Sequence, residues 1–232
     1  MYFVVFNNTT SKDLGIKVVK RPSIPVPERS YRITPVQGKC GDLYEDLGTY
    51  PDIEISIEMN FVEYNPNNFS EFSRKIKKWI NFSDNKLKFS DDLSYFFIVK
   101  KTKISDFNRT FKKIGRFTLT FTCEPYMYLV DGAKERNLAS LINNPYEVCR
   151  PIYKITGEGL LTLTINGINI TANVGQNLII DTGKGLCYRF DRTMNNAALT
   201  GKYKDLYLKE GNNIFTYTSG FDIKIVPNWR CI

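Results

Sequence analysis

The 232-residue chain contains no histidine. This absence excludes the Ser-His-Asp and Cys-His pairs that activate a nucleophile, and it excludes zinc sites ligated by imidazole. It also removes the side chain that most often transfers protons near neutral pH. The composition therefore argues against catalysis, and we expect a protein that is not an enzyme.

Cysteine is scarce and has no functional spacing. No two cysteines have the C-x-x-C separation that metal sites and redox centres use, and their number is odd. This pattern indicates free thiols in a reducing compartment. The five residues are Cys40, Cys123, Cys149, Cys187 and Cys231.

Long apolar runs are also missing. Lys or Asp interrupts every hydrophobic stretch before it reaches the roughly eighteen residues that a membrane span requires. The apolar residues 1–8 have no basic flank and no small-residue cleavage site, so they predict a strand and not a signal peptide. We expect a soluble protein, made in a cytoplasm, with no membrane partner.

The excess of positive charge is modest. The net charge of +8 comes from 32 basic and 24 acidic residues, and both halves of the chain share it. Because neither half forms a basic tail, the charge indicates a solvated surface more than a nucleic-acid site. A hydrophobic content of 42% at this length suits two domains of ordinary size.

Alternating apolar and polar residues predict strands in the first half of the chain. Residues 52–64, 94–100 and 115–124 show this pattern or are rich in aromatic residues, and we expect them to share a sandwich core. The predicted inward side chains of the first and third strands are Ile53, Ile55, Ile57, Met59, Phe61, Phe117, Leu119, Phe121 and Cys123.

One helix is predicted between these strands, from about residue 68 or 70 to Ile80. Its apolar residues recur at three- and four-residue spacing, and its cations suit the negative end of the helix dipole. A basic helix could contact nucleic acid or a membrane, but the complete apolar stripe favours packing of Trp79 on a sheet. The stripe is Phe69, Phe72, Ile76, Trp79 and Ile80, and the cations are Arg74, Lys75, Lys77 and Lys78.

Periodicity weakens over residues 126–150, which indicates a connector with at most a short helix. We place the domain boundary near Asn144, which gives domains of residues 1–144 and 145–232. Asn166-Gly167 predicts a two-residue hairpin turn in the second domain. Seven short strands predict a compact sandwich there, at residues 152–156, 160–165, 168–172, 178–181, 186–191, 214–218 and 221–226. The expected fold is mostly β, with two β-sandwich-type domains.

Candidate chemical motifs have plain structural explanations. The paired carboxylates Glu45-Asp46 and Asp91-Asp92 are neighbours, and neighbours on a strand point to opposite faces, so neither suits a glycosidase; the second pair follows Ser90 and indicates a turn. Residues 157–159 and 183–185 contain paired glycines between predicted strands and lead into no helix, so we expect hairpin connections and not phosphate loops. No D-x-D-x-D-G spacing indicates calcium. We therefore predict no catalytic, cofactor or metal residues.

Aromatic residues make up 14% of the chain. With basic neighbours they could stack on single-stranded nucleic acid, although most have inward parity on predicted strands and indicate core packing. Tyr188 and Tyr207 fall in less certain positions. An exposed tyrosine on a β-sandwich could stack on a sugar ring, so the two are speculative glycan-stacking residues.

The order of several short motifs extends over nearly the whole chain. The motif residues are Gly38, Gly41, Trp79, Asp91, Pro125, Tyr126, Pro151, Gly157, Asp181, Gly211, Asn213, Pro227 and Trp229. In this order and spacing the chain resembles the distal tail protein family of long-tailed bacteriophages. One departure is Lys39-Cys40-Gly41, where the family would have Gly-Arg-x-Gly or similar.

The resemblance implies a structural virion protein of the phage tail tip. The N-terminal domain would assemble into a ring, a homo-hexamer around the tail lumen, and a galectin-like or carbohydrate-module-like sandwich would lie outside it. Implied partners are the tail-tube protein, the tail-associated hub protein and a receptor-binding protein, while DNA passes through the lumen without specific binding. The alternative is a carbohydrate-binding module used in adsorption to the host cell wall.

A lumen for DNA should not be strongly cationic, because phosphate contacts would retain the DNA. We therefore expect the cations of residues 74–78, together with Lys100 and Lys101, to face outward or to pair with acids at the joints of the ring.

Overall fold

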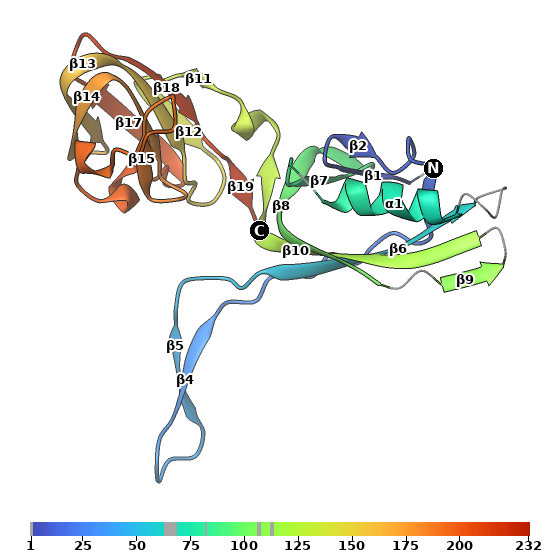
Figure 1. Ribbon diagram of the computed structural model, residues 1–232. Coiled ribbons are helices and arrows are strands. Elements are labelled where there is room, and N and C mark those ends of the chain that lie inside the picture. Colours follow the sequence, from blue (N-terminus) through green and yellow to red (C-terminus); the bar gives the residue numbers. More distant parts are fainter. Residues whose placement is uncertain (1, 63–68, 82, 106–107, 112–113) are drawn as a thin grey trace. The chain divides into compact units, whose positions relative to one another are not determined.

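The computed structural model describes residues 2–62, 69–81, 83–105, 108–111 and 114–232. The chain forms two compact units, of which the first ends at Met127 and also includes Ile232, and the second is Tyr128–Cys231. Both units are built mainly from β-strands (Figure 1). The expected mostly β, two-domain fold is confirmed. Residues 63, 64 and 68, which the expected strand and helix touched, lie outside the described residues.

The two units divide between Met127 and Tyr128, whereas the sequence placed the boundary near Asn144. The intervening segment contains a short 3-10 helix, η2 (Asp131–Ala133), and two short strands. β11 (Arg136–Asn137) pairs with β18 (Asp222–Val226), and β12 (Leu141–Asn144) pairs with β17 (Gly211–Tyr217). These partners are distant in sequence, so local periodicity did not reveal that this segment contributes to the second unit.

The main sheet of the first unit has the described strand order β2-β1-β7-β8-β10-β6-β3, and β9 also pairs with β10. β6 and β10 are antiparallel, with Ile57 opposite Leu119. The predicted inward residues of both strands are buried, because alternate side chains of a strand point to one face. The strands are β1 (Val4–Phe6), β2 (Thr9–Thr10), β3 (Ile16–Val18), β6 (Ile53–Val62), β7 (Lys86–Phe89), β8 (Asp92–Ile104), β9 (Asn108–Phe111) and β10 (Ile114–Leu129).

The helix α1 (Phe69–Ile80) packs on this sheet, as its apolar stripe predicted. The Trp79 ring meets Phe6 of β1 edge to face, with 6.1 Å between ring centroids, and its Nε1 donates a 2.8 Å hydrogen bond to the Phe6 carbonyl. Phe72 stacks on Phe61 of β6 at 4.3 Å. The helix therefore contacts strands from both halves of the sheet order, β1 and β6, and shares one core with them.

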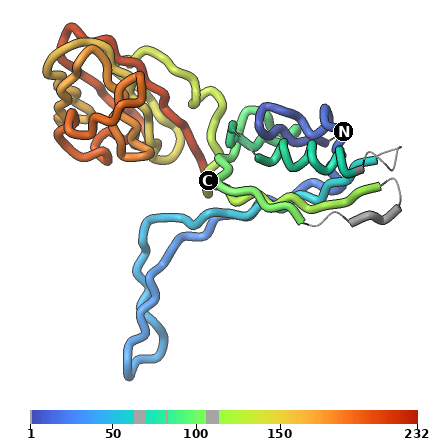
Figure 2. Tube along the Cα trace, in the orientation of Figure 1, coloured from blue at the N-terminus to red at the C-terminus, as the bar shows by residue number. Residues whose placement is uncertain are grey.

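A separate hairpin leaves the main sheet after β3 and returns at β6. Its strands β4 (Tyr31–Pro35) and β5 (Asp42–Asp46) form a two-stranded sheet of their own, with every residue of both strands exposed. We call residues 31–46 the arm; Figure 2 traces the chain through it. The sequence alone does not predict the arm, because the arm has no buried face to impose a clear alternation.

The second unit is organised around one long hairpin. β13 (Ile152–Ile165) and β14 (Ile168–Asp181) pair along their whole length, and Asn166 and Gly167 have the expected positive φ angles, 50° and 82°. The remaining elements are β15 (Leu186–Tyr188), η3 (Asn196–Ala198), β16 (Leu199–Thr200), η4 (Tyr203–Leu206) and β19 (Arg230–Cys231). Buried aliphatic residues surround Tyr153, whose hydroxyl donates a 2.8 Å hydrogen bond to the Leu206 carbonyl.

Two sequence-based expectations about this hairpin are wrong. Residues 152–165 and 168–181 were each divided into two short strands, and residues 157–159 were expected to be a connection. Gly157 and Gly159 instead lie inside β13, opposite Gln176 and Val174. Glycine is a strong turn signal, but Gly157 is needed here because a β-carbon would lie 2.5 Å from the Phe221 ring. Residues 183–185 do form a turn, between β14 and β15.

No helix in the described part of the chain is long and apolar enough to cross a membrane.

Candidate functional site

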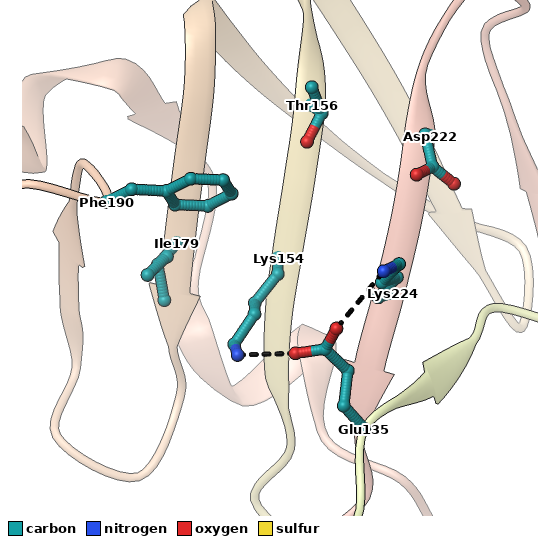
Figure 3. A pocket seen from close by; sticks show the side chains of 7 residues that line it. All are labelled: Glu135, Lys154, Thr156, Ile179, Phe190, Asp222 and Lys224. Atoms are coloured by element: carbon teal, nitrogen blue, oxygen red, sulfur yellow. Dashed lines mark hydrogen bonds and ion pairs between the residues drawn. The ribbon is translucent and has the colours of Figure 1, made fainter.

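A surface pocket of the second unit lies across three neighbouring strands, β14, β13 and β18. Lys154 of β13 is opposite both Ile179 of β14 and Lys224 of β18, and Thr156 is opposite Asp222. Side chains that are opposite each other on antiparallel strands share one face about 5 Å apart. Together with Glu135 and Phe190 they line a cavity of about 340 Å³, which we call the β13 pocket (Figure 3).

Glu135 is held between the two lysines of this pocket. Its Oε2 accepts a hydrogen bond from Lys154 Nζ, and its Oε1 is 3.3 Å from Lys224 Nζ. The hydrogen bond from Lys154 lowers the pKa of the Glu135 carboxyl, and the bond from Lys224 adds to this effect. Glu135 is therefore a carboxylate at neutral pH, and the ion pairs tie the segment before β11 to β13 and β18.

Phe190 forms the apolar wall of the β13 pocket. Its ring lies beside Ile179 and extends toward β13 (Figure 3), and the residue is 52% exposed. The Phe190 amide donates a 2.8 Å hydrogen bond to Asn177 Oδ1, and Asn177 is opposite Thr156 in the sheet. The backbone that carries the ring is thus anchored to the strand beneath it.

The groups that line the pocket can form hydrogen bonds to a ligand, but they are not arranged for catalysis. Two ammonium groups and two carboxylates balance in charge, and Thr156 adds a hydroxyl that can donate or accept. Lys154 and Glu135 neutralise each other, so neither is poised as a general base or nucleophile. In the described residues, no group of three or more His, Cys, Asp or Glu side chains could hold a metal ion.

The two tyrosines suggested as glycan-stacking residues are not brought together at one site. Tyr188 of β15 is half-buried and is opposite Ile179, so it neighbours the β13 pocket without lining it. Tyr207 lines a different, shallow depression of about 620 Å³. The Arg150 guanidinium lies over the Tyr207 ring, 5.6 Å from its centroid. The guanidinium therefore covers the ring face on which a sugar would stack.

Phe190 was missed by the sequence analysis although it is two residues after Tyr188. The sequence placed Phe190 inside an expected strand, residues 186–191, but β15 ends at Tyr188 and Phe190 lies in the turn that follows. Its charged neighbours Arg189 and Asp191 were the available signal of exposure.

The motif residues of the first unit have structural roles. Gly38 and Gly41 have positive φ angles of 79° and 86° in the turn of the arm. Trp79 is buried against β1, and Asp91 lies in the predicted turn before β8. Burial, followed by the charge of Asp91, raises the pKa of the Tyr2 hydroxyl to about 12.

Pro125 and Tyr126 continue this set on β10. Pro125 is buried, and the Tyr126 ring meets Tyr50 edge to face with 6.1 Å between centroids. Tyr50 follows the arm, so this contact holds the returning chain at the sheet.

The motif residues of the second unit stabilise turns and strand ends. Asn213 is fully buried; its side chain accepts from the Lys209 amide at 2.9 Å and donates to the Lys209 carbonyl at 2.8 Å. Gly211 has a φ of 85°, which lets the chain turn where β17 begins. Asp181 accepts a 3.0 Å hydrogen bond from the Lys184 amide, and the Pro151 carbonyl accepts one of 2.7 Å from the Thr182 hydroxyl.

Pro227 and Trp229 close the second unit near its C-terminal end. Pro227 is buried, and the Trp229 ring lies between Arg136, at 4.6 Å from its centroid, and Tyr146, at 6.1 Å. Gly132 is required opposite it, because a β-carbon there would lie 2.6 Å from the Trp229 amide nitrogen.

The arm is the second candidate surface, and it exposes large apolar side chains. Tyr31, Ile33 and Tyr44 share one face, which also carries Asp46 opposite Tyr31, and are 48%, 53% and 60% exposed. The other face carries the Arg32–Glu45 ion pair of 3.1 Å and Leu43, which is 56% exposed. Exposed apolar groups gathered in this way mark contacts with another protein, and a lone two-stranded hairpin is only marginally stable in water.

These features define a two-domain, mostly β protein with a hairpin that exposes apolar side chains. No protein-family model and no curated protein matches the chain. Among solved structures, the chain is similar to the crystal structure of SPP1 Dit (gp 19.1), described as a paradigm of the hub adsorption apparatus in phages that infect Gram-positive bacteria. The TM-score is 0.65 at 12% sequence identity, and the alignment covers 97% of this chain and 98% of the other. At this identity the similarity concerns the fold.

Proposed function

We propose that this chain is a structural protein of a phage tail tip that belongs to the host-adsorption apparatus. The observation that carries the proposal is the fold match to SPP1 Dit, which extends over 97% of the chain and includes both units. The order of sequence motifs supports the same family independently, because it depends on residues and not on the path of the backbone.

We further propose that the first unit assembles into a closed ring, a homo-hexamer. A ring of this kind uses heterologous contacts, in which each subunit offers one patch to a different patch on the next. The arm supports this arrangement, since its exposed Tyr31, Ile33 and Tyr44 would lose their contact with water by packing on a neighbour. The ring would join the tail-tube protein to the tail-associated hub protein, with a receptor-binding protein as a further partner.

The charges of the first unit are compatible with a lumen that lets DNA pass. Lys75 pairs with Glu71 at 3.2 Å, and Lys100 pairs with Asp52 at 2.7 Å. Arg74, Lys77 and Lys78 are exposed on α1. We propose that these three face away from the lumen or meet acids of a neighbouring subunit, because an unpaired cationic wall would retain DNA.

Mass measurement by light scattering, combined with negative-stain images, tests the assembly. We expect a six-fold ring with a central hole, formed by the chain alone or on addition of the tail-tube protein. A monomer under both conditions would contradict the ring. A ring that binds neither tube nor hub protein would contradict the proposed place of the chain in the tail.

A further inference from the structure

We propose that the depression beside Tyr207 binds a phosphate monoester, with the phosphate among lysines and the organic group against tyrosine rings. The depression lies in the second unit, between the turn at residues 182–185 and the 3-10 helix η4. Its volume of about 620 Å³ lies within the range of sites for small molecules. We call it the lysine depression, and it is lined by residues 182–185, Lys202, Tyr203, Lys204 and Tyr207.

Positive charge dominates the lysine depression. Lys184, Lys202 and Lys204 are exposed where they line it, and the Arg150 guanidinium lies over the Tyr207 ring. The ammonium groups of Lys202 and Lys204 form no ion pair with any residue that the structure describes. Like charges that are held close together repel one another. An anion bound among them would therefore relieve this repulsion in addition to forming its own contacts.

The neighbouring carboxylates do not neutralise this charge. The Asp181 side chain is only 6% exposed, accepts a 3.0 Å hydrogen bond from the Lys184 amide and lies 3.4 Å from Lys184 Nζ. Asp205 belongs to η4, but neither it nor any other acidic residue of the described chain lines the depression. The β13 pocket differs, because two carboxylates there balance two lysines. The lysine depression is therefore suited to an anion.

The number of cations selects the class of anion. A phosphate monoester has a charge of about −1.5 to −2 near neutral pH and three strong acceptor oxygens. Each lysine ammonium is a compact charge with three N–H donors, so Lys184, Lys202 and Lys204 can share these oxygens. A carboxylate or a phosphate diester offers less charge and fewer terminal oxygens. The monoester is the anion that uses all three lysines together.

The tyrosines provide a fixed wall for the organic group. The Tyr203 hydroxyl donates a 3.3 Å hydrogen bond to Cys187 Sγ, and a β-carbon added to Gly185 would lie 3.9 Å from Cδ2 of Tyr203. The ring is thus held against the turn, which lowers the entropic cost of binding. Burial raises the pKa of the Tyr203 hydroxyl, so this group stays uncharged and does not repel an anion. Tyrosine rings offer apolar surface to the carbon atoms of a ligand.

Titration of the full chain with phenyl phosphate, measured by isothermal calorimetry, tests the site. We expect saturable binding at low ionic strength that weakens as salt is added, because salt screens exposed charges. Phenol tests the ring without the phosphate, and methyl phenyl phosphate is the matched diester. We expect both to bind at least about tenfold more weakly than phenyl phosphate. Absence of saturable binding of phenyl phosphate, or equal binding of phenol or the diester, would overturn the proposal.

Variants locate the binding. Lys202→Ala combined with Lys204→Ala should weaken binding of phenyl phosphate about tenfold or more, because two charged donors are lost. Lys184→Gln is a second variant that should weaken it. Lys134→Ala is the matched control, an exposed lysine of the same unit that does not line the depression.

Thermal unfolding of each variant establishes that it is folded. Unchanged affinity in the folded Lys202 and Lys204 variant, or an equal loss in Lys134→Ala, would overturn the assignment. The inference does not rest on the ring, since binding of the phosphate ester requires only the surface of the second unit.

Discussion

Gly157 and Phe221 are so close that a β-carbon on Gly157 would lie 2.5 Å from Cδ1 of the Phe221 ring. Gly157 also has a φ of 148°, a conformation that side chains rarely adopt. Gly157→Ala should therefore lower the free energy of unfolding by about 2–4 kcal/mol, measured by chemical denaturation. Gly159→Ala is the control, because Gly159 has a φ of 108° with no atom within 4 Å of its added β-carbon. An equal loss in both variants would contradict the steric part of the explanation.

Trp79 supplies both packing and a hydrogen bond to the first unit. Trp79→Phe removes the 2.8 Å hydrogen bond from the indole Nε1 to the Phe6 carbonyl and shrinks a buried ring. We expect a loss of about 1–3 kcal/mol for Trp79→Phe and about 3–5 kcal/mol for Trp79→Ala, read from thermal unfolding. Lys78→Ala, on the exposed side of the same helix, should change stability little. Similar losses in the Lys78 and Trp79 variants would argue against the packed helix.

Asn213 satisfies several backbone groups in the loop before β17. Asn213→Ala leaves the part-buried Lys209 amide and carbonyl without this partner and opens a gap at a fully buried position. We expect a loss of about 2–4 kcal/mol. Asn212→Ala is the control, since Asn212 forms an exposed 2.8 Å bond with Asn143. An Asn213→Ala variant with nearly unchanged stability would show that solvent replaces these hydrogen bonds.

Glu135 should make stability depend on pH. Its pKa is lowered in the folded chain, first by the hydrogen bond from Lys154, so the unfolded chain binds more protons as the pH falls toward 4.5. The stabilisation is present above the unfolded pKa and is lost as the pH falls through the folded pKa. Urea titrations across about pH 6 to 3 should show a smaller loss of stability in Glu135→Gln than in the parent chain. Parallel pH profiles for the two proteins would contradict this role.

The arm should govern assembly without affecting the fold of the subunit. Ile33→Asp with Tyr44→Asp replaces two exposed apolar side chains of the arm by charges, and burial of these charges in an interface would be unfavourable. We expect the ring to dissociate into monomers with unchanged thermal unfolding of the subunit, measured by light scattering. Leu160→Asp is the matched control, an apolar residue that is 66% exposed on β13. Rings that persist in the arm variant would show that the arm does not form the contact between subunits.

Strong local patterns were sufficient for the elements with one buried face. The alternation of Ile53, Ile55 and Ile57 predicted β6, and the stripe that includes Ile76 predicted α1, because burial on one side imposes a period that can be read directly. The sequence pattern divides β13 at Gly157, since a glycine there resembles a turn until its neighbour Phe221 is known. The arm shows no such pattern, because Ile33 and Tyr44 are exposed and no core imposes a period.

The candidate site could not be read from the sequence for a related reason. Glu135, Lys154, Asp222 and Phe190 come from separated segments, and only the pairing of β13 with β14 and β18 brings them to one face. The sequence pointed to Tyr188, which is one strand away. By itself, the sequence determined the absence of histidine chemistry, the mostly β character and the amphipathic helix α1, because these depend on composition and local period. The tertiary structure decided the division at Met127, the free arm and the β13 pocket, because these depend on which distant strands pair.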